Sequence, residues 1–318
     1  MDFQTKIKIP ILVTGSHRSG TTWVGKMISF SPQVQYIYEC FHPNGILRSK
    51  KIFDIWYQYL DEQDQQPYLN ELERIFKYKY SFFEAFSLFD RFGKFNLRNS
   101  PVRIDFYCDV LKLRVTLKKE KPQPLLKDPI ALFSADWIFE NFQSQNIVLI
   151  RHPAAFVSSL RRLNWRFDFN NFLNQPKLME KHLHSFEDQI NSLSGNPIEE
   201  AAVLWNCIHH VIKYYHDNFP SWIFRRHEDL SLEPVNQFED LYSILDLDFT
   251  NKIKDKIKIL TGETMPGEVR KKEKIHQLKR NSKATIKNWK KRLSQDEINK
   301  IRLLTDPIAN HFYSDEDW

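Results

Sequence analysis

The sequence contains few cysteines, few glycines and no long apolar run. Its three cysteines, Cys40, Cys108 and Cys207, are far apart in the 318 residues and lack CxxC spacing. That pattern argues against a disulfide framework or a zinc site, and it favours reduced thiols in a cytoplasmic protein. The eight glycines are too few for a loop-rich or all-β architecture, so we expect a fold that contains helices.

Segments that would direct the chain to a membrane are also missing from the sequence. The apolar run near the N-terminus stops after about five residues, which is too short for the core of a signal peptide. No stretch approaches the roughly 18 apolar residues that a membrane span needs. We therefore expect a cytoplasmic enzyme without a membrane span.

The composition that remains is that of a globular α/β protein with a basic surface. Hydrophobic residues make up 42% of the chain and aromatic residues 14%, which is enough to build a core. The length suits a single domain over residues 1–318. The net charge of +6 and the isoelectric point near 9.0 favour an anionic ligand or partner.

Short apolar segments of strand character alternate with segments of helical character along the chain. This alternation predicts a three-layer, P-loop-like α/β fold with a central parallel sheet of about five strands. In such a fold, ligands bind at the carboxyl ends of the strands. The strands are expected at residues 7–14, 34–38, 124–127, 146–151 and 222–225, and helices at 21–30, 130–142, 154–163 and 198–218.

Two regions depart from this alternation. Residues 45–122 mix aromatic and charged side chains at helical spacing, and we expect them to form a helical insertion that covers the sheet. Residues 252–292 form a basic C-terminal segment with 15 Lys and Arg against 4 Asp and Glu. This segment is suited to bind the anionic ligand or an anionic acceptor, although a charge run is also typical of a solvated face.

Residues 15–22, GSHRSGTT, follow the first expected strand with the spacing of a phosphate-binding loop. Thr21 stands where a nucleoside triphosphatase has its lysine, which argues against hydrolysis of ATP or GTP. The backbone N–H groups of the loop and of the helix start would still converge on an anion. Arg18 adds a charged fork, and Thr21 and Thr22 add hydroxyl donors.

The sequence RSGTTW at residues 18–23 resembles the 5′-phosphosulfate loop of sulfotransferases that use 3′-phosphoadenosine 5′-phosphosulfate (PAPS). An arginine at position 18 is more like the carbohydrate and tyrosylprotein branches, because the cytosolic branch has lysine there. The resemblance implies PAPS as co-substrate and no metal. It also implies that Trp23 stacks on the adenine, which suits an aromatic face. The cofactor-binding residues implied in this loop are Arg18, Ser19, Gly20, Thr21, Thr22 and Trp23.

A second motif, IVLIRHPAAFVSSL, places Arg151 at the end of an expected strand and Ser159 eight residues later. An arginine at a strand end and a serine early in the next helix can converge on a phosphate dianion. The same arrangement resembles the 3′-phosphate site of the family. Near the C-terminus, residues 279–294 resemble the basic loop that closes over the cofactor, which implies roles for Arg280, Ser282 and Lys283.

Sulfuryl transfer needs a base for the acceptor hydroxyl and a stabiliser for charge on the departing oxygen. Glu39 ends the strand VQYIYE and resembles the glutamate base of the tyrosylprotein and carbohydrate branches. His42 and His17 are alternatives, because the cytosolic branch uses a histidine.

The LLKDP sequence places Lys127 at the end of another expected strand. Its resemblance to the tyrosylprotein branch implies that Lys127 supports the departing phosphate oxygen, and Asp128 is expected to cap the next turn or to orient Lys127. Arg18, which would hold the transferred group, completes the expected catalytic set.

These observations predict a sulfotransferase that moves a sulfuryl group from PAPS to an acceptor hydroxyl, with a carbohydrate as the preferred acceptor. The insertion and residues 165–172 are where acceptor recognition is expected. Small aryl or alkyl alcohols are alternative acceptors. A P-loop nucleotide kinase is a rival function, and a basic module that binds nucleic acid or an acidic polymer is another. No nucleic-acid motif accompanies the basic segment, so no nucleic-acid partner is expected.

Overall fold

The computed structural model describes residues 8–43, 52–62, 65–79, 121–262, 282–283 and 286–318. At its centre is a five-stranded sheet with the order β2-β3-β1-β4-β5, in which every pairing is parallel. This arrangement confirms the predicted α/β class and sheet. The strands are β1 (Ile11–Gly15), β2 (Val34–Tyr38), β3 (Gln123–Lys127), β4 (Gln145–Ile150) and β5 (Ile223–Arg226).

The first strand begins and ends later than residues 7–14, the range expected from the sequence. Pro10 has no backbone N–H to donate to a neighbouring strand, and Ile9 is 52% exposed. Regular pairing therefore starts at Ile11, opposite Leu125 of β3 and Gln145 of β4. Residue 7 lies outside the described residues.

The helices agree with the expected alternation, with one difference. The segment expected as one helix over residues 130–142 is a 3-10 turn, η1 (Ile130–Ser134), followed by α5. The helices are α1 (Thr21–Ile28), α2 (Gln65–Phe76), α5 (Ala135–Phe142), α6 (Pro153–Arg162), α7 (Asn170–Leu173), α8 (Pro176–Leu178), α9 (Glu187–Asn191), α10 (Pro197–Asn218), α11 (His227–Leu232), α12 (Pro234–Ile244), α13 (Asn251–Thr261) and α14 (Gln295–Ala309).

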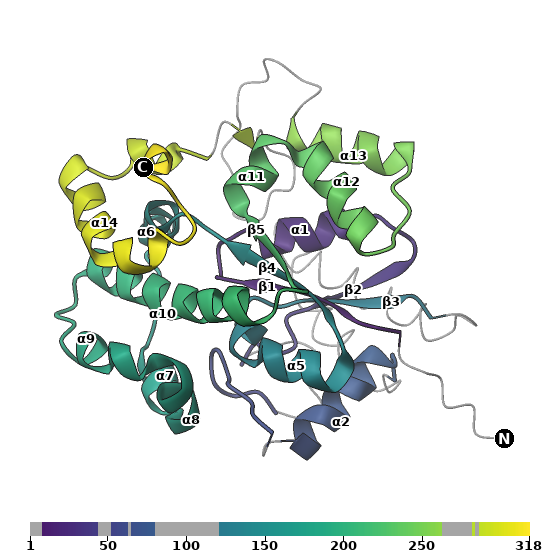
Figure 1. The fold of residues 1–318 in the computed structure, drawn as a ribbon, viewed down its shortest axis with the longest axis horizontal. Helices are drawn as coiled ribbons and strands as arrows, with labels where there is room; N and C mark the ends of the chain where they lie inside the picture. Colours follow the sequence, from purple (N-terminus) through teal and green to yellow (C-terminus); the bar gives the residue numbers. More distant parts are fainter. Residues whose placement is uncertain (1–7, 44–51, 63–64, 80–120, 263–281, 284–285) are drawn as a thin grey trace, which may run out of the picture.

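Helices cover both faces of the sheet and give three layers. Helices α1, α11, α12 and α13 lie on one face, and α2 and α5 lie on the other (Figure 1). Successive strand residues point to opposite faces, so Leu12 and Val13 of β1 enter different cores. On one face Val13 belongs to the core that includes Trp23 and Phe238, and on the other Leu12 belongs to the core that includes Leu72 of α2.

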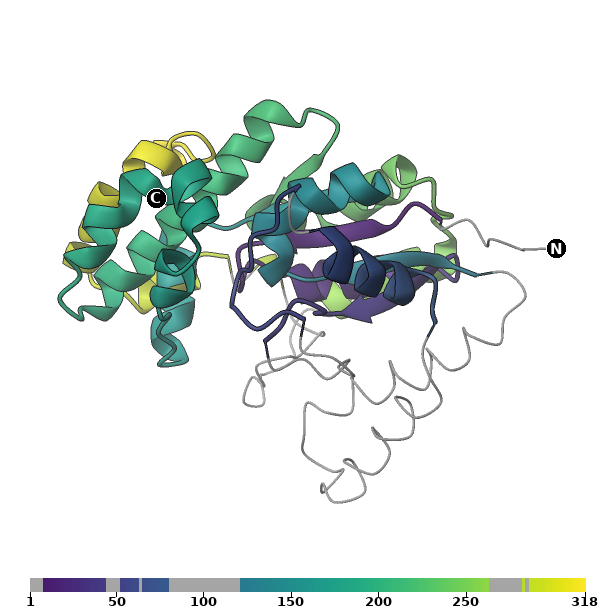
Figure 2. The same ribbon diagram turned by 90° about the horizontal axis from the view of Figure 1, so that it is seen from below.

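A further group of helices extends the molecule beyond the carboxyl end of β4. Helix α10 packs against α6 and α14, and α7, α8 and α9 lie beside them (Figures 1 and 2). Asn196 caps α10 by accepting hydrogen bonds from the N–H groups of Ile198 and Glu199. Ser294 and Glu297 form a capping box at the start of α14. These caps explain why both helices begin where they do.

Two expectations about the environment of the protein can be compared with the described residues. None of the described helices has the combination of length and apolar character that a bilayer-spanning segment requires. Cys40 and Cys207 are buried, and Cys108 lies outside the described residues, so the reduced state of the thiols stays a prediction. The cytoplasmic location stays a prediction.

Candidate active site

The loop between β1 and α1 runs so close to its neighbours that glycine is needed at both of its ends. Gly15 has a φ of +129°, and a Cβ there would lie 2.3 Å from the carbonyl oxygen of Leu149. Gly20 has a φ of +96°, and a Cβ there would lie 2.7 Å from Nδ1 of His227. Within the described residues, no side chain caps the start of α1. Its first N–H groups therefore remain available to an anion.

Buried hydroxyl groups line the same loop. Thr14 Oγ1 and Ser16 Oγ are buried and have no hydrogen-bond partner among the residues that the structure describes. Ser19 donates to the carbonyl of Ser16, and Thr21 is buried at the helix start. Because an orphaned buried hydroxyl is costly, these groups fit a loop that receives a polar ligand.

Arg18, Arg151 and Ser159 meet at the carboxyl ends of β1 and β4. Arg18 has a left-handed backbone conformation, with a φ of 66°, and its Nε donates to Ser159 Oγ over 3.2 Å. Arg151 donates from Nη1 to the carbonyl oxygen of Arg18. The two phosphate motifs read from the sequence, 141 residues apart at Arg18 and Ser159, therefore form one continuous basic site. Ser158, the residue before Ser159, is also buried.

Glu39 and Lys127 form an ion pair across the ends of the adjacent strands β2 and β3. The Lys127 side chain is fully buried, and its Nζ lies 4.1 Å from the centre of the Tyr38 ring. The Glu39 side chain is 13% exposed, and its backbone N–H donates to the carbonyl of Lys127 over 3.0 Å. Because β3 is also the neighbour of β1, this pair lies on the same edge of the sheet as the loop.

Asp128 caps the turn after β3, as expected from the sequence. Its Oδ1 accepts from the N–H of Ile130 over 3.0 Å, and its Oδ2 accepts from the N–H of Phe41 over 2.7 Å. Burial raises the pKa of Asp128 to about 7, with a further contribution from the negative charge of Glu39. Asp128 thus holds the segment after Glu39 against the end of β3.

The two histidines considered as alternative bases have different surroundings. His17 is buried, its Nδ1 is hydrogen-bonded to the Tyr57 hydroxyl, and its ring packs 4.3 Å from that of Trp165. Burial, with the nearby charge of Arg18, lowers the pKa of His17 well below its ordinary value. His42 is half-buried, and its ring lies 4.7 Å from the Trp56 ring.

Trp23 lies largely within the core rather than on the surface of the loop. Its side chain is 5% exposed, and its ring packs edge-on against Phe238 and His227, at 5.3 and 5.9 Å. Contact with an adenine would therefore involve only the part of the ring that reaches the surface. This packing gives Trp23 a structural role in the core between α1 and α12.

The three residues expected from the C-terminal loop are not all described. Ser282 is buried, and its hydroxyl donates to the carbonyl of Ser231 over 2.9 Å, which ties this loop to α11. Lys283 is exposed, and Arg280 lies outside the described residues. The structure therefore anchors Ser282 on the α11 side of the sheet and leaves the contacts of Arg280 undefined.

The sequence did not predict the residues that hold the chain in place directly after Arg151. His152 is buried, and its ring stacks on Trp289 with the ring centres 4.9 Å apart. Glu228 accepts from the backbone N–H of His152 over 3.3 Å and from the Tyr313 hydroxyl over 3.0 Å. Burial raises the pKa of Glu228, whereas the charge of Arg151 acts in the opposite direction. Glu228 lies in the stretch RHEDL at residues 226–230, for which the sequence predicts a structural role.

A group of aromatic rings lies beside the loop, and the sequence predicted a role for only part of it. Trp56 and Trp165 are half-buried, with ring centres 6.1 Å apart, and Trp165 contacts His17. Trp165 belongs to the stretch expected to recognise the acceptor. Trp56 belongs to the predicted insertion, in which no single residue had been distinguished.

A model of the sulfotransferase family matches residues 10–251, from the residue before β1 to the first residue of α13. The match covers most of the chain and all five strands, and the chain therefore belongs to the sulfotransferase family. This confirms the resemblance read from the two phosphate motifs. It also identifies the chain as an enzyme of the class that transfers sulfuryl groups.

Several solved structures are similar to the chain at low identity. The sulfotransferase domain from the curacin biosynthetic pathway has 15% identity and a TM-score of 0.49, with 95% of this chain and 99% of that domain covered. A sulfotransferase from Mycobacterium avium has 13% identity and a TM-score of 0.45, with 97% of this chain and 78% of that chain covered. A mouse sulfotransferase complexed with PAP has 12% identity and a TM-score of 0.43, with 97% of this chain and 86% of that chain covered. A search of curated proteins finds no significant match.

Proposed function

We propose that the chain transfers a sulfuryl group from PAPS to a hydroxyl group of a carbohydrate, with Glu39 as the base. The observation that carries this proposal is the Glu39–Lys127 ion pair on the same sheet edge as the anion-binding loop. A proton acceptor, a cation and an anion cradle are the three parts that an in-line transfer needs.

The donor would be held by the two phosphate motifs. The loop N–H groups and Arg18 suit the 5′-phosphosulfate, and Arg151 with Ser159 suits the 3′-phosphate. Since Arg18 contacts both Ser159 and Arg151, the two sub-sites share one hydrogen-bond network. The mouse sulfotransferase was solved with PAP, the product that PAPS would leave, and a donor of this kind fits the two basic sub-sites of this chain.

In the proposed reaction, the acceptor oxygen attacks the sulfur of PAPS while its proton passes to Glu39. The bond from sulfur to the bridging oxygen breaks, and that oxygen takes the negative charge of the leaving phosphate. As Glu39 becomes neutral, it no longer balances the charge of Lys127. The ammonium group is then free to stabilise the leaving oxygen at the moment its charge develops.

The surroundings of the alternative bases favour Glu39. The Nδ1 atom of His17 is engaged with Tyr57, and its ring is enclosed by aromatic side chains. His42 follows Glu39 by three residues but packs against Trp56. Glu39, in contrast, remains partly exposed at a strand end and is oriented by a buried cation.

The acceptor class is a separate part of the proposal. A carbohydrate is favoured by Arg18 and Glu39, which resemble the carbohydrate branch. A small aryl alcohol is the second candidate, because Trp56 and Trp165 present half-buried rings beside the loop. Aromatic faces also pack against sugar rings, so an acceptor panel is needed to distinguish the two classes.

The donor is tested by calorimetric binding of 3′-phosphoadenosine 5′-phosphate without metal, compared with AMP and with ATP plus Mg²⁺. We expect binding that needs the 3′-phosphate and weakens by about 100-fold in Arg151→Ala, which removes a charged hydrogen-bonding group. Arg161→Ala is the matched control, because Arg161 pairs with Glu297 on the surface. Equal or tighter binding of Mg-ATP would support the nucleotide kinase instead.

The acceptor is tested by turnover with PAPS on a panel of sugars, oligosaccharides and phenols. Sulfation of sugars but not phenols is the expected result. Efficient sulfation of phenols that is lost in Trp56→Ala, with donor binding retained, would replace the carbohydrate by an aryl alcohol. Donor-independent, salt-sensitive binding of DNA would instead favour the basic module.

A further inference from the structure

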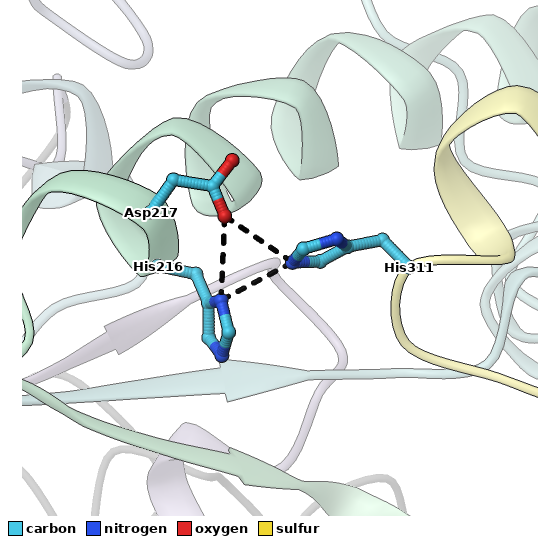
Figure 3. A group of neighbouring side chains, drawn as sticks. All are labelled: His216, Asp217 and His311. Carbon is cyan, nitrogen blue, oxygen red and sulfur yellow. Dashed lines mark hydrogen bonds and ion pairs between the residues drawn. The ribbon is translucent and has the colours of Figure 1, made fainter.

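Three potential metal ligands meet on the surface, in a part of the chain that the proposed reaction does not use. His216 and Asp217 lie at the C-terminal end of α10, and His311 follows α14, 95 residues after His216 (Figure 3). Figure 3 shows all three side chains directed toward a common point. The fold has therefore brought together residues that no local motif connects.

The distances between the ligand atoms suit a single ion. His216 Nδ1 and His311 Nε2 are 3.1 Å apart, and each lies 3.6 Å from Oδ1 of Asp217. A point about 2.0 Å from all three atoms exists at these separations, and this is the length of Zn–N and Zn–O bonds. The side chains are 46%, 42% and 26% exposed, in chain order, so water can reach a fourth position.

The neighbouring groups hold the ligand atoms in this orientation. Lys213 pairs with Oδ2 of Asp217, which leaves Oδ1 directed at the histidines. The His216 ring packs edge-on against Phe224 at 5.0 Å, and the His311 ring against Phe312 at 4.7 Å. Such outer contacts raise the affinity of a site by orienting its ligands. The C-terminal end of α10 also carries partial negative charge, which favours a cation.

We propose that His216, Asp217 and His311 form a surface zinc site, with water as the remaining ligand. Two imidazoles and one carboxylate form a ligand set that suits Zn²⁺ far better than Mg²⁺ or Ca²⁺, which prefer oxygen. The sequence argued against a zinc site because its cysteines are far apart, and the proposed site uses no cysteine. Its ligands are separate from the residues assigned to sulfuryl transfer.

A metal at this position would join the end of α10 to residues 310–318, which follow α14. His311 precedes Tyr313 by two residues, and the Tyr313 hydroxyl donates to Glu228 behind Arg151. The ion would thus fix the segment that supports the β4 end of the sheet. Its effect is on the stability of the fold, and it supplies no group to the transferred sulfate.

The site is tested by titrating ZnCl₂ into the tag-free, chelator-treated chain by calorimetry. We expect one Zn²⁺ per chain and a rise in Tm of roughly 5 °C at saturation, since only the folded state assembles the three ligands. Cobalt(II) in place of zinc should give the visible absorption of a tetrahedral site. His311→Gln and Asp217→Asn should each weaken Zn²⁺ binding by about 100-fold or more.

The matched control is His184→Gln. The ring of His184 lies 3.5 Å from Glu187 but is 83% exposed, and no third ligand accompanies it among the described residues. Its removal should leave the zinc affinity unchanged. Equal zinc affinity of the wild type, His311→Gln and Asp217→Asn would overturn the proposal and indicate adventitious binding elsewhere. Absence of stoichiometric binding by the wild type would overturn it as well.

Discussion

The carboxyl edge of the sheet has two halves that are held in place by different parts of the chain. In the β2–β3 half, Glu39 and Lys127 pair with each other, and Asp128 holds the backbone of the next segment. In the β4–β5 half, His152 contacts Glu228 of α11 and the rings of Trp289 and Trp318. The first half is supported by residues that follow its own strands, whereas the second also depends on residues from elements outside the sheet.

The difference lies in which elements carry the polar partners. β3 and β4 each lie between two strands, and Lys127 at the end of β3 pairs with Glu39 after β2. His152 after β4 instead meets Glu228 of α11, which accepts from its backbone N–H. The rings of Trp289 and Trp318, which also lie outside the sheet, pack against the His152 ring.

The largest expected effect is on the chemistry of the β2–β3 half. Glu39→Gln keeps an oxygen that can accept a hydrogen bond from Lys127 but removes the base. We expect turnover to fall by about 10²- to 10⁴-fold, while calorimetric binding of 3′-phosphoadenosine 5′-phosphate is unchanged. His42→Gln is the matched control. An active Glu39→Gln enzyme with an inactive His42→Gln enzyme would transfer the role of base to His42.

A second prediction concerns Asp128, whose pKa is raised by burial to about 7 from 3.8. Between those pH values the unfolded chain loses a proton that the folded chain keeps. The free energy of unfolding should therefore fall as pH rises from about 4 to about 7, by up to about 4 kcal/mol from this group. Urea unfolding across that range should show this slope in the wild type and a flatter one in Asp128→Asn. Parallel curves would contradict the assignment.

In the β4–β5 half the pH dependence has the opposite sign. Burial lowers the pKa of His152 from 6.5 to about 3, against a smaller opposing effect of Asp317. The contribution of neutral His152 to the free energy of unfolding is complete above pH 6.5 and is lost as pH falls toward 3. The loss amounts to about 2 kcal/mol by pH 5. His152→Phe, which keeps a ring against Trp289, should remove this acid sensitivity in urea unfolding. His184→Gln, at an exposed histidine, should retain it.

The smallest expected effect concerns Tyr313, which is linked to Arg151 through Glu228. Tyr313→Phe removes the hydroxyl that donates to Glu228, and it should lower the free energy of unfolding by about 1 kcal/mol. It should also weaken binding of 3′-phosphoadenosine 5′-phosphate. Tyr242→Phe, which loses hydrogen bonds to Met27 and Ile28 on the far side of α1, is the control for stability alone. Equal affinity of the two variants for 3′-phosphoadenosine 5′-phosphate would show that Tyr313 has no influence on the donor site.

Much of the fold was predictable because its signals are local. Each strand is a short apolar run, and each phosphate motif is a few residues that follow a strand directly. Strand limits were less accurate, since the ladder of β1 begins at the first residue after Pro10 that can pair with both β3 and β4. The burial of Trp23 against Phe238 could not be predicted, because it depends on how α12 packs on α1.

The sequence alone therefore determined the class of fold, the two anion-binding motifs and the positions of Glu39 and Lys127, since each depends on neighbours along the chain. Only the tertiary structure decided that Glu39 pairs with Lys127 and that Trp289 and Tyr313 support the end of β4. It also decided that His311 joins His216 and Asp217. Those contacts connect residues 85 or more positions apart, and side-chain packing between separate elements selects them.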